Sequence, residues 1–385
     1  MRRIVVLCCQ LLVLGLTQGC QLSVQPIATP QLPDLGHTDN STSFVVPQLE
    51  EMYRLSPEQI AELTQFTLRE DIALLPKQKQ AYEFLKSRLV NFDFEGENYF
   101  ASESLALGRG NCMALAMLTY AIARELDIQI NFQVMHTMPI LLDVSGKFAM
   151  TSDHVRSFLF QEVSEEQTTY LWQRDRIVID YFPDRYDRGG KMIDEDEFFA
   201  MFYRNLAADS MMVGEFEYAH LLLKRALELA PDYAPVINML AVASRQLSDN
   251  RLAEALYQYG LQVADEKVTL LSNYHVLLTK QGRDQEARQI KQQLLAYDDQ
   301  RPYIWYLQAK DAMAINDFES AEVYLNKFLE NTNYYHKAYF DLAKVQLQLG
   351  KPYKAKKALD LAISYSSSSE NKGLYEAKLN WLSSL

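Results

Sequence analysis

Residues Leu206–Pro231, with the sequence LAADSMMVGEFEYAHLLLKRALELAP, decide the fold of the C-terminal half. The stretch has a turn residue at Gly214 and a small residue at Ala219, and it ends on a proline. Both positions recur every 34 residues. The alanines are Ala219, Ala253, Ala287, Ala321 and Ala355, and the turn residues are Gly214, Ser248, Gly282, Asn316 and Gly350. A small residue suits two helices that pack closely, so the spacing predicts five helix–turn–helix units over 200–369.

A helix–turn–helix period of this length resembles that of tetratricopeptide (TPR) repeats. The resemblance implies an all-α superhelix with a concave groove, closed by a capping helix over 370–385. Groove-facing candidates, by resemblance to other such repeats, are Asn238, Arg245, Tyr306, Lys310 and Lys344. These side chains are expected to grip an extended peptide or an acidic segment of a partner protein. For any single one, the alternative is an ordinary surface residue.

A second informative stretch is Gly108–Ala116, GRGNCMALA. Two glycines precede Cys112, and an apolar-periodic run to Leu126 predicts a buried helix that starts at the cysteine. The positive end of a helix dipole favours a thiolate over a thiol, which is what a nucleophilic cysteine needs. The alternative is a small buried cysteine that fills core space.

A thiol nucleophile needs a base and an acceptor that orients the base. Strands are predicted over 129–135, 154–160 and 176–182, which after the preceding helices gives an α+β domain. His154 opens one strand and Asp180 lies in the next, so antiparallel pairing would bring both within reach of Cys112. His136 is an alternative base, and Asp153, Asp184 and Asp187 are rival acids.

This order of residues resembles the papain-related transglutaminase-like superfamily. The shared sequence motifs are Gly110-Asn111-Cys112, Ala121-Ile122-Ala123-Arg124, Asp153-His154-Val155 and Ile179-Asp180-Tyr181. The resemblance implies that Cys112 is the nucleophile, His154 the base and later the acid, and Asp180 the residue that orients the base. Met113 and Arg156 occupy positions where typical members have tryptophan, and the second oxyanion donor is open between Tyr99 and Asn111.

The N-terminal sequence predicts that the protein is exported. Residues 1–19 have a basic start and a short apolar run, and Leu16-Thr17-Gln18-Gly19-Cys20 resembles the lipobox of bacterial lipoproteins. Cys20 would then be lipidated and, with Gln21 after it, held at the periplasmic face of the outer membrane. Cleavage would leave Cys112 as the mature chain's only cysteine thiol. An ordinary secretory peptide cut near Gly19 is the alternative. Residues 20–50 contain four prolines and predict a tether.

Charge and motifs exclude several function classes. The formal net charge is −12, which argues against non-specific nucleic-acid binding. No metal-ligand spacing, phosphate-binding loop or cofactor motif is present in the sequence, so we predict no metal and no cofactor.

The expected transglutaminase-like α+β domain covers residues 51–199. With this domain followed by the repeats, two functions remain. The first is a membrane-anchored periplasmic thiol enzyme that acts on amide bonds of a protein or peptide, by hydrolysis rather than transamidation; peptidoglycan cross-link chemistry would change only its substrate. The second is a catalytically inactive domain that serves, with the TPR repeats, as a protein-interaction scaffold in the cell envelope.

Overall fold

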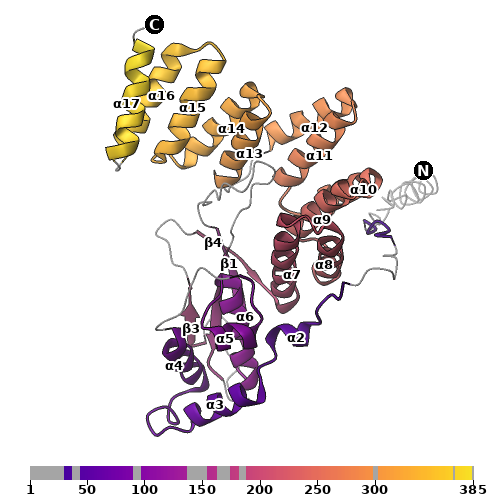
Figure 1. The fold of residues 1–385 in the computed structure, drawn as a ribbon, viewed down its shortest axis with the longest axis vertical. Coiled ribbons are helices and arrows are strands. Elements are labelled where there is room, and N and C mark those ends of the chain that lie inside the picture. The colour runs from indigo at the N-terminus through magenta and orange to yellow at the C-terminus, as the bar shows by residue number, and fades with distance from the viewer. Residues whose placement is uncertain are drawn as a thin grey trace, which may run out of the picture. The chain divides into compact units, whose positions relative to one another are not determined.

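A computed structural model describes residues 30–36, 44–89, 97–136, 154–162, 174–181, 188–297, 302–366 and 369–383 (Figure 1). The predicted signal segment and Cys20, the predicted lipidation site, lie outside these residues. Within the described ranges, no helix is long and apolar enough to cross a membrane.

The first part of the described chain combines short helices with a sheet. Its helices are α2 (Leu49–Tyr53), α3 (Pro57–Thr67), α4 (Lys77–Leu89), α5 (Ala101–Leu107) and α6 (Cys112–Glu125). Its strands are β1 (Ile130–His136), β2 (His154–Phe160), β3 (Arg176–Ile179) and β4 (Arg188–Ile193). The order in the sheet is β3-β2-β1-β4, and every neighbouring pair is antiparallel. An α+β layout is therefore present.

Helix α6 is the buried element of this part. Every residue from Met113 to Ala123 is buried, as its continuous apolar sequence predicts. Tyr120 on this helix packs against Phe199, with ring centroids 5.3 Å apart. Phe132 of β1 stacks on Phe198, with ring centroids 3.8 Å apart. One hydrophobic core thus joins α6 and β1 to the next helix, α7 (Glu195–Met212).

The rest of the described chain consists of helices alone. They are α7, α8 (Phe216–Leu229), α9 (Ala234–Gln246), α10 (Asn250–Val263), α11 (Val268–Lys280), α12 (Asp284–Ala296), α13 (Pro302–Ala314), α14 (Phe318–Asn331), α15 (His336–Gln348), α16 (Pro352–Tyr365) and α17 (Ser369–Ser383). Helices α8, α10, α12, α14 and α16 begin 34 residues apart, and so do α9, α11, α13 and α15. The predicted helix–turn–helix period is confirmed by these boundaries.

The turn within each pair has the same backbone conformation. Gly214, Ser248, Gly282, Asn316 and Gly350 all have positive φ, between 60° and 87°. This left-handed conformation ends the first helix of each pair and suits glycine or asparagine. The five alanines that recur every 34 residues are at most 5 % exposed, because they lie where paired helices are closest.

Part of the stretch predicted as a tether contacts the first helix pair. The Lys224 ammonium group donates a hydrogen bond to the Gly36 carbonyl oxygen at 2.7 Å. The Tyr203 hydroxyl group donates to the Pro47 carbonyl oxygen at 2.6 Å. The backbone is thus held against α8 at Gly36 and against α7 at Pro47.

Candidate functional site

Cys112 occupies the first position of α6. Gly108, with φ at 62°, ends α5, and Asn111 caps α6 by accepting a hydrogen bond from the Ala114 backbone N–H at 3.0 Å. Cys112 is partly exposed and packs against the hydrophobic core. Its place at a capped helix N-terminus is the setting that favours a thiolate.

A polar chain connects this cap to the first helix of the repeats. The Asn111 side-chain amide donates to Asn98 Oδ1 at 2.7 Å. The Asn98 amide in turn donates to Asp209 Oδ2 on α7, also at 2.7 Å. Burial raises the pKa of Asp209 above its usual range, which the bond from Asn98 opposes. The orientation of the α6 N-terminus is therefore coupled to α7, a link that sequence reasoning missed.

Asp180 lies one residue beyond the end of β3, not within a strand as predicted, because the β2–β3 ladder runs only from Phe160–Arg176 to Ser157–Ile179. Its neighbour Tyr181 is buried. The Tyr181 hydroxyl group donates to Thr119 Oγ1 of α6 at 2.5 Å and lies 3.0 Å from Ser157 Oγ of β2. Burial raises the pKa of Tyr181, and negative charge on Cys112 or Asp180 would raise it further. Tyr181 thus ties α6, β2 and the end of β3 together near both candidate residues.

His154 begins β2, in register with Met135 of β1. Because β2 and β3 are antiparallel, the start of β2 and the end of β3 lie at the same end of the pair, as predicted for His154 and Asp180. His136, the alternative base, ends β1. The side chains of His154 and His136, and the rival acids Asp153, Asp184 and Asp187, lie outside the described residues. The catalytic set Cys112, His154 and Asp180 stays a prediction.

Three of the five groove candidates converge on one carboxylate. The Tyr306 hydroxyl group donates to Asp341 Oδ2 at 2.9 Å. The Lys310 ammonium group lies 3.3 Å from the same oxygen, and that of Lys344 lies 2.9 Å from Asp341 Oδ1. The Asp341 side chain is 5 % exposed, whereas those of Lys310 and Lys344 are 37 % and 45 % exposed. We call these four residues the Asp341 cluster.

The cluster joins the first helices of two successive repeats, since Tyr306 and Lys310 lie on α13 and the other two on α15. One buried carboxylate holds two ammonium groups that keep contact with solvent, so the cluster presents net positive charge. Sequence reasoning missed Asp341. The available signal was an acid three residues before Lys344, which places both on one helix face.

The other two groove candidates lie elsewhere along the array. Asn238 Oδ1 accepts a hydrogen bond from the Asn273 amide at 2.9 Å, which links α9 to α11. Arg245, in the last turn of α9, lines a cavity of about 190 Å³. The structure therefore distributes the five candidates over three places.

No group of His, Cys, Asp and Glu residues suited to a metal ion occurs within the described ranges.

Comparison with known proteins gives similar solved structures only. Neither a protein-family model nor a curated protein matches the chain. A solved structure of pilF from Pseudomonas aeruginosa is 19 % identical, covers 49 % of this chain and 94 % of its own, and has a TM-score of 0.33. YrrB, described as a TPR protein with an unusual peptide-binding site, is 18 % identical over 47 % of this chain and 92 % of its own, with a TM-score of 0.29. PilW, described as a type IV pilus biogenesis factor, is 17 % identical over 47 % and 91 %, with a TM-score of 0.32. The repeat architecture of this chain is established by its own helix boundaries.

Proposed function

We propose that this protein is an interaction scaffold whose TPR array binds a protein or peptide partner. The Asp341 cluster is the observation that carries the proposal. Two half-exposed ammonium groups on successive first helices are held by a buried carboxylate, so they are oriented before a ligand arrives. Preorganised cations of this kind suit an acidic or polar segment of a partner chain.

The test is selection of peptides from a displayed library against the intact array, followed by affinity measurements. We expect selected peptides to bind Lys310→Gln and Lys344→Gln at least tenfold more weakly than the unchanged protein. Lys356→Gln, an equal charge change at an exposed position of α16, is the matched control and should bind as the unchanged protein does. Equal affinity for all three variants would refute the role of the cluster.

A second candidate function is a thiol enzyme with a transglutaminase-like domain, which acts on amide bonds through Cys112, His154 and Asp180. The observation that favours it is the partly exposed cysteine at a capped helix N-terminus. The test is the pH dependence of Cys112 alkylation by iodoacetamide in a chain without residues 1–20, beside the variant His154→Ala. An apparent pKa well below the free-thiol value of about 8.5, lost in the variant, would support the enzyme. Slow labelling that the variant leaves unchanged would exclude it.

The proposal includes the location of the scaffold. Lipidation at Cys20 would hold the protein at the periplasmic face of the outer membrane. Metabolic labelling with a fatty acid and fractionation of a Cys20→Ser variant test this point; label retained by the variant would contradict it.

A further inference from the structure

Helix α12, the second helix of the third pair, buries little of its surface. Two of its 13 residues, Ala287 and Leu294, are buried. In α8 and in α10, by contrast, six of 14 residues are buried. The cause lies in the sequence DQEARQIKQQLLA, whose apolar side chains form a narrow strip among charged and amide side chains. The hydrophobic effect therefore holds α12 more weakly than it holds α8 or α10.

The hydrophobic core of the described chain is divided at this helix. One contiguous cluster contains the buried apolar side chains of α10, and a second cluster contains those of α14. Ala287 of α12 belongs to the first cluster and Leu294 to the second, while the partly buried Ile290 packs against both. The third pair thus lies between two blocks of the array, each of which has its own core.

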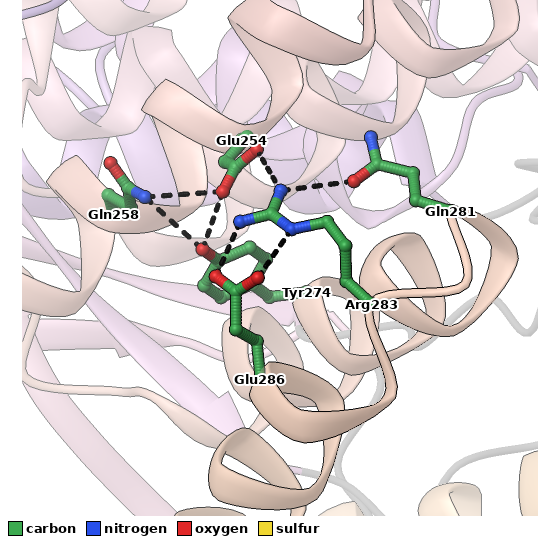
Figure 2. A network of polar contacts seen from close by, with 6 residues as sticks. All are labelled: Glu254, Gln258, Tyr274, Gln281, Arg283 and Glu286. Atoms are coloured by element: carbon green, nitrogen blue, oxygen red, sulfur yellow. Dashed lines mark hydrogen bonds and ion pairs between the residues drawn. The ribbon is translucent and has the colours of Figure 1, made fainter.

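Polar side chains tie the third pair to the preceding one (Figure 2). Arg283, the N-cap residue of α12, donates from Nη1 to Glu254 Oε2 of α10 at 2.6 Å. The same guanidinium group binds the Glu286 carboxylate through Nε and Nη2. The Tyr274 hydroxyl group of α11 donates to Glu254 Oε1 at 2.9 Å. One carboxylate of α10 therefore contacts both segments of the third pair, at α11 and at the start of α12.

A second set of polar contacts ties α12 to the following pair. The Lys291 ammonium group of α12 donates to Oδ2 of Asp317, the N-cap residue of α14, at 2.8 Å. The Lys327 ammonium group of α14 donates to the carbonyl oxygens of Leu295 and Tyr297, at the C-terminal end of α12, at 2.8 and 2.7 Å. Helix α12 is thus held by charged groups on both sides.

Water reaches the two ion pairs. The exposed fraction of the side chain is 33 % for Arg283 and 20 % for Glu254, and it is 31 % for Lys291 and 21 % for Asp317. Ion pairs in contact with solvent weaken as the salt concentration rises, because mobile ions screen them over a Debye length of about 3 Å at 1 M. Buried apolar contacts are not screened in this way. The arrangement of the third pair therefore depends on salt more than that of its neighbours.

We infer that the third pair is a hinge of the array, held in the observed arrangement by the ion pairs of Arg283 and Lys291. When these ion pairs open, the two blocks turn relative to one another while each keeps its own core. Asn238 lies in the first block and the Asp341 cluster in the second, so this motion changes the distance between them. The motion is a property of the unliganded array and goes beyond the proposed function.

Distances between spin labels, measured by double electron–electron resonance in the full chain, test the hinge. The four cysteines are replaced by alanine, and new cysteines are placed at exposed positions without charge. Gln262→Cys on α10 with Asn326→Cys on α14 spans the third pair, whereas Asn326→Cys with Ser364→Cys on α16 stays within the second block. At low salt we expect narrow distance distributions for both label pairs. In 1 M NaCl the spanning distribution should widen at least twofold, and the other should not change.

Lys291→Gln and Arg283→Gln should each widen the spanning distribution at low salt, because each variant opens one side of the hinge. Arg288→Gln, at an exposed position of α12 outside both ion pairs, removes the same charge and should have no effect. An unchanged distribution between the labels of the second block shows that a variant is folded.

Three results would overturn the hinge. They are a spanning distribution that widens neither in 1 M NaCl nor in the Lys291 variant, equal widening in Arg288→Gln, and equal widening between the two labels of the second block. No peptide is present in these measurements, so their failure is distinct from failure of the proposed function.

Discussion

The Tyr306 hydroxyl group donates a 2.9 Å hydrogen bond to the carboxylate of Asp341, across the boundary between two repeats. Burial and the negative charge of Asp341 together raise the pKa of Tyr306, so the phenol stays protonated and remains a donor. The bond fixes a buried acid beneath two lysines that solvent reaches. One contact thus serves both the packing of α13 on α15 and the surface that the array presents.

Asp341→Leu should lower the free energy of unfolding by about 1–3 kcal/mol, because it removes three charge-assisted hydrogen bonds while both lysines can turn to solvent. Trp305, next to Tyr306 and 2 % exposed, gives a local fluorescence signal for urea unfolding. Asp360→Leu, at an exposed position of α16, is the control and should change stability by less than about 0.5 kcal/mol. Equal effects of the two variants would contradict the structural role of Asp341.

Replacing glycine by alanine should change the stability of the protein in opposite directions at two positions. Gly282→Ala should destabilise the protein by about 1 kcal/mol, since φ there is 71° and a Cβ atom strains this conformation even in open space. Gly373→Ala, inside α17 and also in open space, should stabilise it by up to about 1 kcal/mol through helix propensity. Thermal unfolding of both variants measures the difference, and shifts of the same sign would be inconsistent with it.

Stability should fall at mildly acidic pH because of His220. Burial in α8 lowers the pKa of His220 to about 4, from 6.5 in the unfolded chain. Between these values the unfolded state binds the proton and the folded state does not, so stability decreases as the pH falls from 6.5 to 4, by up to about 3 kcal/mol. Urea unfolding at several pH values measures this loss. His220→Leu should remove this part of the pH dependence; parallel profiles for the two proteins would argue against a buried neutral histidine.

The cap of α6 should matter for both stability and the thiol. Asn111→Ala should cost about 1 kcal/mol, because the Ala114 N–H loses its acceptor, and fraying of the first turn should raise the pKa of Cys112. Asn98→Ala should shift both quantities in the same direction by less, since it acts through Asn111. Iodoacetamide labelling at several pH values and denaturant unfolding measure the two effects. Asn205→Ala is the control, because the hydrogen bond that Asn205 donates to Asn98 Oδ1 is long, at 3.4 Å. An equal effect of this variant would rule out coupling through Asn98.

A helix start can be predicted from the sequence where the capping residue lies next to the helix that it caps. Ser56, which precedes Pro57, caps α3, and Asp194, which precedes three acids, caps α7, because an N-cap side chain satisfies backbone N–H groups within its own turn. Strand β4 was missed. Its sequence, RGGKMI, contains two glycines, and a Cβ atom at Gly189 would lie 2.9 Å from Gln133 Nε2 of the neighbouring strand. That reason for a glycine exists only once the sheet is formed.

The sequence by itself determined the 34-residue period, the left-handed turns and the position of Cys112 at a helix start, because each depends on spacing along the chain. Only the tertiary structure decided which side chains meet. It brought Lys310 and Lys344 to Asp341, joined Asn111 through Asn98 to Asp209, and placed Arg245 beside Lys280. The physical reason is that these contacts cross between helices. The relative position of two helices is set by how their buried faces pack, which the spacing of residues along either helix does not specify.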